Sequence, residues 1–211
     1  MAISSHVVSR DLQSALARLE SRLREFEAPL ADSFRAGANE DSIRETFAAE
    51  DLTAHDDVLA WWGWHDGAEV DAPRVESGPG MVLRGENTLV GPWHMPTLAD
   101  ALRTRRWNLD LYRETGDDEL LPSSWLPIAM TDGAGDLCAD TAALGPAPLH
   151  ILDHETLWER SPPQFESLAE FVALLNRVLD DGLVVPDAMD SRARMVDFPR
   201  LPAELRRLAM W

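Results

Sequence analysis

The sequence predicts an α+β fold in which an antiparallel or mixed β-sheet packs against helices. Three short segments of strand-like composition follow one another at 125–131, 136–141 and 149–154, with turn residues between them. Segments with the apolar spacing of amphipathic helices come before and after these three. We therefore expect an antiparallel meander that the following helix covers on one face.

The first expected element is an amphipathic helix between Asp11 and Glu27 that Pro29 ends. Its apolar residues recur at alternating steps of four and three, at Leu12, Leu16, Leu19, Leu23 and Phe26. About two heptads are short for an autonomous coiled coil, so this helix should lean on the main body. The chain then divides into an N-terminal helical segment, 1–38, a main domain, 39–185, and a short C-terminal extension, 186–211.

Start signals indicate further helices after a short one around Ile43 and Phe47. The capping pairs are Thr53 with Asp56, Thr97 with Asp100, and Ser167 with Glu170. Gly67 and Gly182 are expected to end the first and the last of these helices. Brief strands at 81–83 and 88–90 and a helix at 203–211 complete the expected elements.

The charged residues of the chain argue against several classes of function. All 19 basic residues are arginine, which excludes Schiff-base chemistry and phosphate loops that need a lysine. The 37 acidic residues give a net charge of −18, which argues against nucleic acid as a partner. Residues 51–185 carry 24 acids and 8 arginines. A negative surface of this kind attracts a basic protein partner, although it also serves solubility.

The sequence contains no run of about 18 apolar residues, and its first residues lack the apolar core of a signal peptide. We therefore expect a cytoplasmic protein that does not use a membrane. The single cysteine, Cys138, excludes an intrachain disulfide and should be a buried, inert thiol.

Few residues suggest catalysis or metal binding. His150 and His154 would lie about 13 Å apart on one face of a strand, too far for one zinc ion without a bend. His65 with Asp66, and His55 with two aspartates, have no catalytic motif around them. We expect no catalytic residues, no metal and no cofactor; an enzyme using a metal at His65 or His150 is the remaining hypothesis of that class.

Three tryptophans crowd the end of one predicted helix, at Trp61, Trp62 and Trp64. Clusters of this kind are typical of core and rim packing, and stacking on a ligand is the alternative.

The segments SWLPIAMTDGAGDLCAD and PLHILDHETLWERSPPQFESLAEFVALLNRVLDDG resemble the sequence core of the SUKH superfamily. The resembling positions in and around the strands are Trp125, Pro127, Asp132, Gly133, Gly135 and Asp140. The helix end WGWHDGA, with Trp62 and Gly67, extends the resemblance, which spans roughly residues 40–182. It implies an α+β domain without catalytic apparatus. The long first helix and the residues after Gly182 depart from the family pattern.

Members of this superfamily act by binding, and two functions follow from the resemblance. Bacterial members commonly neutralise a secreted toxin, often a nuclease, of a polymorphic toxin system, whereas fungal members are adaptors in signalling and cell-wall assembly. Since nuclease toxins tend to be basic, an immunity protein with an acidic face fits the charge of this chain. The acids predicted to form that face are Asp56, Asp57, Asp66, Glu69, Asp117, Asp118 and Glu119. A regulatory adaptor is the alternative.

Overall fold

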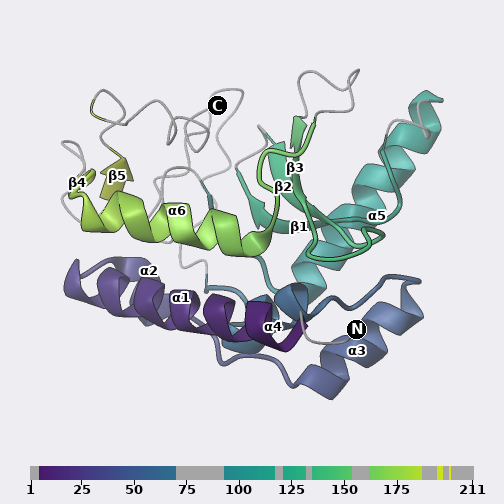
Figure 1. Cartoon of the computed structure of the whole chain (residues 1–211). Helices are drawn as coiled ribbons and strands as arrows, with labels where there is room; N and C mark the ends of the chain where they lie inside the picture. Colours follow the sequence, from purple (N-terminus) through teal and green to yellow (C-terminus); the bar gives the residue numbers. More distant parts are fainter. Residues whose placement is uncertain are drawn as a thin grey trace.

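A computed structural model of the chain describes residues 5–69, 93–116, 121–131, 135–153, 162–186, 194–196 and 200. This part forms six helices, a three-stranded sheet and a two-stranded sheet (Figure 1). The elements are α1 (Ser5–Glu25), α2 (Pro29–Ser33), α3 (Glu40–Ala49), α4 (Asp56–Trp64), α5 (Leu98–Thr115), β1 (Trp125–Met130), β2 (Gly135–Asp140), β3 (Leu149–Asp153), α6 (Leu168–Asp180), β4 (Val184–Pro186) and β5 (Arg194–Val196).

The predicted α+β class is confirmed. The pairing of β4 with β5 was not predicted, because each strand has only three residues and the second lies in the expected C-terminal extension. The strands expected at 81–83 and 88–90 and the helix expected at 203–211 lie outside the described residues. In the part that is described, no helix is both long and apolar enough to cross a membrane.

The larger sheet is the predicted antiparallel meander, in the order β1-β2-β3. Thr131 closes its first hairpin, because its N–H donates to the Gly135 carbonyl at 3.0 Å and its hydroxyl accepts from the Gly135 N–H at 2.8 Å. Asp132 and Gly133, at the expected turn, lie outside the described residues. A register shift between Pro127 and Ala129 interrupts the ladder of β1 and β2.

Both faces of this sheet are buried, and alternate side chains enter two different cores. The larger core takes Leu126, Ile128, Leu137 and Ala139 together with side chains of α1, α4 and α6, so the expected cover by the helix after β3 is confirmed. The smaller core packs Trp125 and Cys138 against Tyr112 of α5. Burial raises the pKa of the Cys138 thiol well above its usual value, in agreement with the expected inert cysteine.

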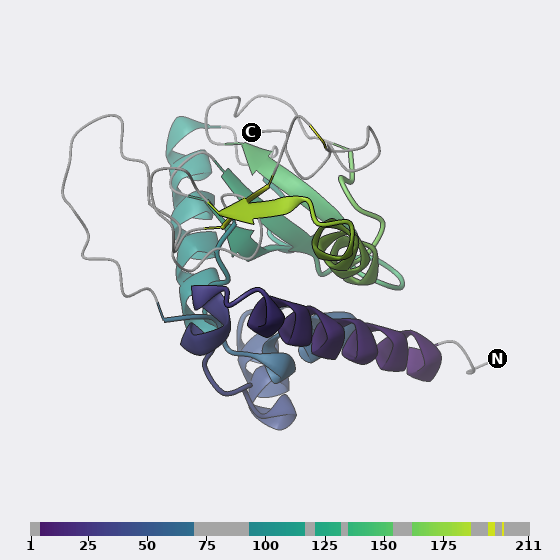
Figure 2. The same cartoon turned by 90° about the vertical axis from the view of Figure 1, so that its left-hand side faces the viewer.

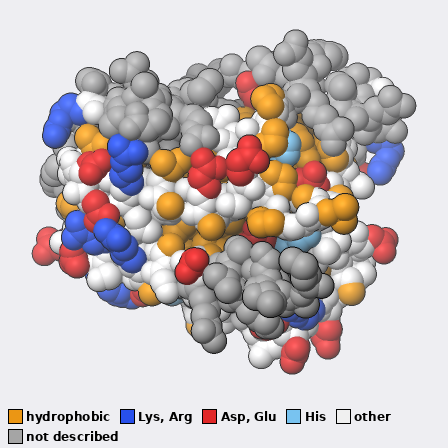
Figure 3. All heavy atoms as spheres, in the orientation of Figure 1, with side chains coloured by type: hydrophobic (Ala, Val, Ile, Leu, Met, Phe, Trp, Pro, Cys, Tyr) orange, Lys and Arg blue, Asp and Glu red, His pale blue; other side chains and the backbone are white. Residues whose placement is uncertain are grey.

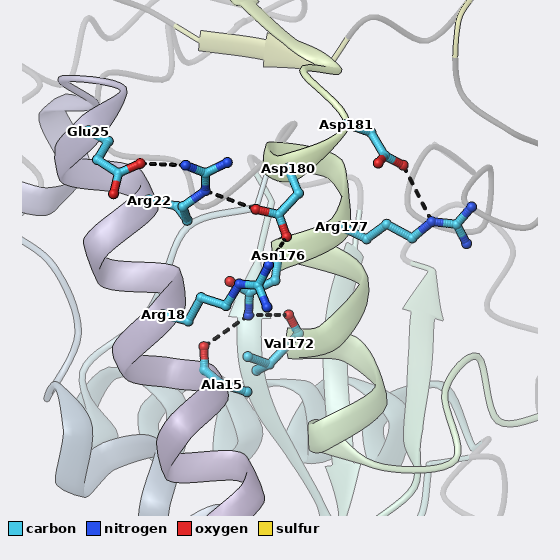
Figure 4. Close-up of polar contacts among 9 residues, drawn as sticks. All are labelled: Ala15, Arg18, Arg22, Glu25, Val172, Asn176, Arg177, Asp180 and Asp181. Carbon is cyan, nitrogen blue, oxygen red and sulfur yellow. Dashed lines mark hydrogen bonds and ion pairs between the residues drawn. The ribbon is translucent and has the colours of Figure 1, made fainter.

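Helices α1 and α6 pack against each other, with their chains running the same way in the view of Figure 1, and Figure 2 shows that their axes cross at an angle. The Asn176 amide donates to the Ala15 carbonyl at 2.9 Å, and the Asp180 carboxylate binds Arg18 at 2.5 Å and Arg22 at 2.9 Å (Figure 4). The leucine stripe of α1 belongs to the larger core, at Leu12, Leu16, Leu19 and Leu23. The first helix therefore leans on the main body, as expected.

The capping pairs of α5 and α6 are confirmed. The Thr97 hydroxyl accepts from the Asp100 N–H at 3.0 Å, and the Ser167 hydroxyl accepts from the Glu170 N–H at 3.1 Å. Gly182 follows α6 with φ of 63°, the left-handed conformation of a helix-ending glycine.

The N-cap residue predicted for α4 is wrong. This helix begins at Asp56 after His55, whose side chain makes no capping hydrogen bond, and Thr53 is not the N-cap. Tertiary contacts of His55 and Asp57, described below, fix this end of the helix in place of a local capping pair.

Gly67 occupies a position that only glycine fits. Its φ is 78°, and a Cβ built on it would lie 2.6 Å from the backbone nitrogen of Thr97. The chain therefore turns after α4 so closely beneath the start of α5 that a side chain would displace one of them.

Replacing Gly67 by alanine should lower the free energy of unfolding by at least about 1–3 kcal/mol, because of backbone strain and the clash with Thr97. Gly63 in α4 is the matched control, since a Cβ there meets no atom within 4 Å. Gly63→Ala should raise stability by up to about 1 kcal/mol through helix propensity. Urea unfolding followed by circular dichroism measures both, and equal effects would contradict this account.

Candidate functional site

A groove of about 630 Å³ lies between α1, α3 and α4. Helices α1 and α4 each turn toward it a stripe of side chains at the i, i+3, i+4 and i+7 spacing of a single helix face, and α3 adds an i, i+4 pair. The lining residues are Gln13, Leu16, Ala17 and Glu20 of α1, Ala38 before α3, Glu40 and Arg44 of α3, and Asp56, Leu59, Ala60, Gly63 and Trp64 of α4.

Helix α4 separates the groove from the larger core. Val58, Trp61 and Trp62 are fully buried on its core side, and the Trp62 indole N–H donates to the Pro96 carbonyl at 3.4 Å. Trp64 is half-buried and lines the groove. The tryptophan cluster thus divides between core packing, as predicted, and the rim of the groove.

Two carboxylates and one guanidinium meet at the end of the groove where α4 begins. Arg44 Nη2 and Nε lie 2.7 and 3.1 Å from the same oxygen of Glu40, and Nη2 lies 3.8 Å from Asp56. The Glu40 and Asp56 side chains are 65% and 49% exposed. An exposed pair of this kind contributes only about 0.3–0.5 kcal/mol, so both carboxylates remain open to a competing cation.

The other end of the groove is closed by a hydrogen-bond network on Glu20. Its carboxylate accepts from Arg24 at 2.8 Å and from the Trp64 indole N–H at 3.1 Å, and it lies 3.2 Å from Nε2 of His65. Nδ1 of His65 lies 2.9 Å from the Arg35 carbonyl, so each ring nitrogen of His65 faces an oxygen acceptor.

Burial by itself would raise the pKa of Glu20, but these hydrogen bonds outweigh it and lower the pKa overall. The Glu20 carboxylate thus binds groups of the protein itself. Its structural effect is to fix the Trp64 ring against α1.

Asp56 is the residue of the predicted acidic face that the structure places in the groove. Its neighbour Asp57 is only 4% exposed, and the interpretation of Asp57 as a surface contact is wrong. The Asp57 carboxylate accepts from the backbone N–H of Val58 at 2.9 Å and of Ala147 at 3.1 Å. Burial raises its pKa despite these bonds.

The other predicted acids lie elsewhere. The Asp66 carboxylate accepts from the Leu98 N–H at 2.8 Å, so it caps the start of α5, and Glu69 is exposed beyond α4. Three further acids, Asp117, Asp118 and Glu119, lie outside the described residues. Glu20, Glu40 and Arg44 were not predicted as site residues. They lie on α1 and α3, whereas Asp56 and Trp64 lie on α4, so no spacing along one helix relates them and only the tertiary packing brings them together.

The described positions that carry the family resemblance are packed or hydrogen-bonded within the fold. The Trp125 ring stacks on His150 at 4.4 Å, and Pro127 and Gly135 are buried in their strands. The Asp140 carboxylate accepts from the Ser124 hydroxyl at 2.8 Å. His154, the proposed second ligand of a metal, lies outside the described residues, and among those described no three His, Cys, Asp or Glu side chains form a metal-binding group.

The loop between β2 and β3 is held beside the acidic end of the groove. His55 Nε2 lies 3.0 Å from the Thr141 carbonyl and Asp57 accepts from Ala147, so the two residues on either side of Asp56 both hold this loop. Leu144, between these anchors, is fully exposed. The loop therefore presents an exposed apolar side chain between two anchored points.

No protein-family model matches the chain, and no curated protein matches it in sequence.

Replacing Asp57 by asparagine should lower the free energy of unfolding by about 1–3 kcal/mol, because one buried N–H loses its acceptor. Asp56→Asn is the matched control at the adjacent position and should change stability by less than about 0.5 kcal/mol. Urea unfolding at pH 7 distinguishes the two. An equal loss of stability would contradict the buried role of Asp57.

The contribution of Glu20 to the free energy of unfolding should depend on pH. Because its folded pKa is lowered, its contribution is complete above the unfolded pKa of about 4.3 and is lost as pH falls through the folded value. Glu20→Gln should cost about 1–2 kcal/mol at pH 7, and this difference from the wild type should narrow as pH falls below about 4.3. Urea unfolding between pH 7 and pH 3.5 measures it; a constant difference would contradict the network.

Proposed function

We propose that this chain is a non-catalytic binding protein that receives a cationic segment of a protein partner in the α1–α3–α4 groove. The observation that carries the proposal is the acidic end of the groove, where the Glu40 and Asp56 side chains are 65% and 49% exposed and both lie by Arg44. Residues 40–57 contain seven acids and one arginine. Apart from Glu50, which pairs with Arg105 and Arg106, and the buried Asp57, five acids remain against Arg44, so the field around this end is negative. Leu144, on the loop that His55 and Asp57 hold, is a fully exposed apolar side chain.

We further propose that the partner is a basic toxin domain, such as a nuclease, and that the chain is an immunity protein of a bacterial polymorphic toxin system. The resemblance of residues 40–182 to the SUKH superfamily and the charge of −16 over residues 51–185 support this. An acidic surface that covers a phosphate-binding site would block a nuclease without any chemistry of its own.

A regulatory adaptor of the cell-wall assembly type is the alternative. It is favoured by the wall that α1 gives to the groove, because α1 precedes the resembling region and the groove can then serve a partner different from that of a typical member. The genes beside this one discriminate the two functions, since a toxin gene is expected next to an immunity gene and not next to an adaptor gene.

The experiment is co-expression with each neighbouring gene product, followed by titration calorimetry of any pair that binds. A toxic neighbour should lose its toxicity in the presence of this chain. The double variant Glu40→Gln/Asp56→Asn should weaken binding by at least about tenfold, as expected for losing charge-assisted contacts. Leu144→Asp should also weaken it without changing stability, because the leucine is fully exposed.

The matched control is Glu114→Gln/Glu166→Gln, which removes the same charge from exposed positions on α5 and before α6. It should retain most of the affinity. If no neighbouring product binds, or if both double variants weaken binding equally, the groove is not the partner site.

A further inference from the structure

The groove already holds one guanidinium group, that of Arg44. Two of its nitrogens bind the same oxygen of Glu40, and Asp56 lies 3.8 Å away on the other side, beyond hydrogen-bond distance. We infer that this end of the groove binds the side chain of an arginine from the partner, in competition with Arg44. The inference rests on the proposed function and specifies the chemistry of what the groove takes.

The two carboxylates match a guanidinium better than an ammonium. A guanidinium presents five N–H donors in a planar fork, which can bridge carboxylates from two helices, whereas a lysine is a compact and strongly hydrated point charge. Arg44 leaves one oxygen of Glu40 and the carboxylate of Asp56 without a hydrogen bond from its guanidinium. An incoming arginine can use these acceptors, and it displaces a pair that is held only weakly.

The rest of the groove suits the backbone on either side of such an arginine. From Asp56 to Trp64 the helix rises about 12 Å, the length of about four extended residues. Along this wall Gly63 exposes its backbone, and a Cβ there would meet no atom within 4 Å. Glycine in the interior of a helix is unfavourable by up to about 1 kcal/mol relative to alanine, and here it leaves room for a chain to approach α4.

The far end of this wall, at Trp64, is ordered before an occupant binds. The Trp64 indole is fixed by its hydrogen bond to Glu20 at 3.1 Å and by its packing on Phe34 at 5.0 Å. A ring that is held before binding loses little freedom when a ligand packs on it. The groove therefore combines an acidic end for the guanidinium with an ordered apolar wall for the neighbouring residues.

The test uses the full chain and a short peptide, acetyl-Ala-Arg-Ala-Ala-amide, titrated by amide NMR with assigned resonances. Shifts are expected at residues 40–44 and 56–64. Arg44→Gln should tighten the Kd by about two- to fivefold, because it removes the competing guanidinium. Asp56→Asn should weaken it by at least about fivefold, and Gly63→Met should block binding by filling the groove.

Arg103→Gln is the matched control, because Arg103 is an exposed arginine that pairs with Asp100 on α5 outside the groove lining. It makes the same charge change and should leave the Kd within about twofold. Peptides with lysine or citrulline in place of arginine should bind more weakly, the uncharged citrulline by at least about tenfold.

The inference is overturned if Arg44→Gln binds no more tightly than Arg103→Gln, or if the citrulline peptide binds as well as the arginine peptide. Because no partner protein enters this titration, its outcome is separate from that of the proposed function. Peptide binding with the expected variant effects would support the arginine site even if no neighbouring gene product binds, a result that would contradict only the proposed function.

Discussion

The position of α4 is the constraint on which the rest of the structure depends. Asp57 and His55 tie its first turn to the loop between β2 and β3, and Glu20 ties its last turn to α1 through Trp64 and His65. Between these ends, Trp61 and Trp62 are fully buried in the larger core. With both ends bonded and one face buried, the helix cannot rotate about its axis without losing core packing, so the opposite face is held toward the groove.

Arginines pair with more of the acidic residues in some regions of the structure than in others. On the face shown in Figure 3, arginine and acidic side chains lie intermixed over the C-terminal ends of α1 and α6, where Asp180 binds two arginines. Near α5, Glu50 is paired with Arg105 and Arg106. Around the start of α4, in contrast, Arg44 is the single arginine of residues 40–57, against five acids besides the paired Glu50 and the buried Asp57. Because the acids in those other regions are paired with arginines, the region around the start of α4 differs from them in having unbalanced negative charge.

For the proposed binding function, the relevant feature of the groove and of the anchored loop that carries Leu144 is that their geometry exists without a partner. The Trp64 ring, the loop and the helix faces are each held by hydrogen bonds or core contacts, so binding there would order few additional groups. Much of the buried polar chemistry of the described chain has a structural purpose of this kind: Asp57 holds a loop, Arg105 binds the Ser123 carbonyl at 2.6 Å, and Asn108 donates to the buried Asp136 at 2.9 Å. These contacts hold the elements in place and require no chemical step.

The sequence by itself determined the features that depend on neighbours in the chain: the α+β class, the order and direction of the three strands, the leucine stripe of α1, and the caps at Thr97, Ser167 and Gly182. These follow from side-chain periodicity and short-range hydrogen bonds. Only the tertiary structure decided which face of α4 is covered. Asp56 and Asp57 are adjacent and chemically identical, but consecutive helical residues point about 100° apart, so one faces the groove and the other the core. Both faces of α4 carry apolar residues, so the sequence of α4 does not indicate which face is buried. The packing of α1 and α6, which are distant in sequence, determines it.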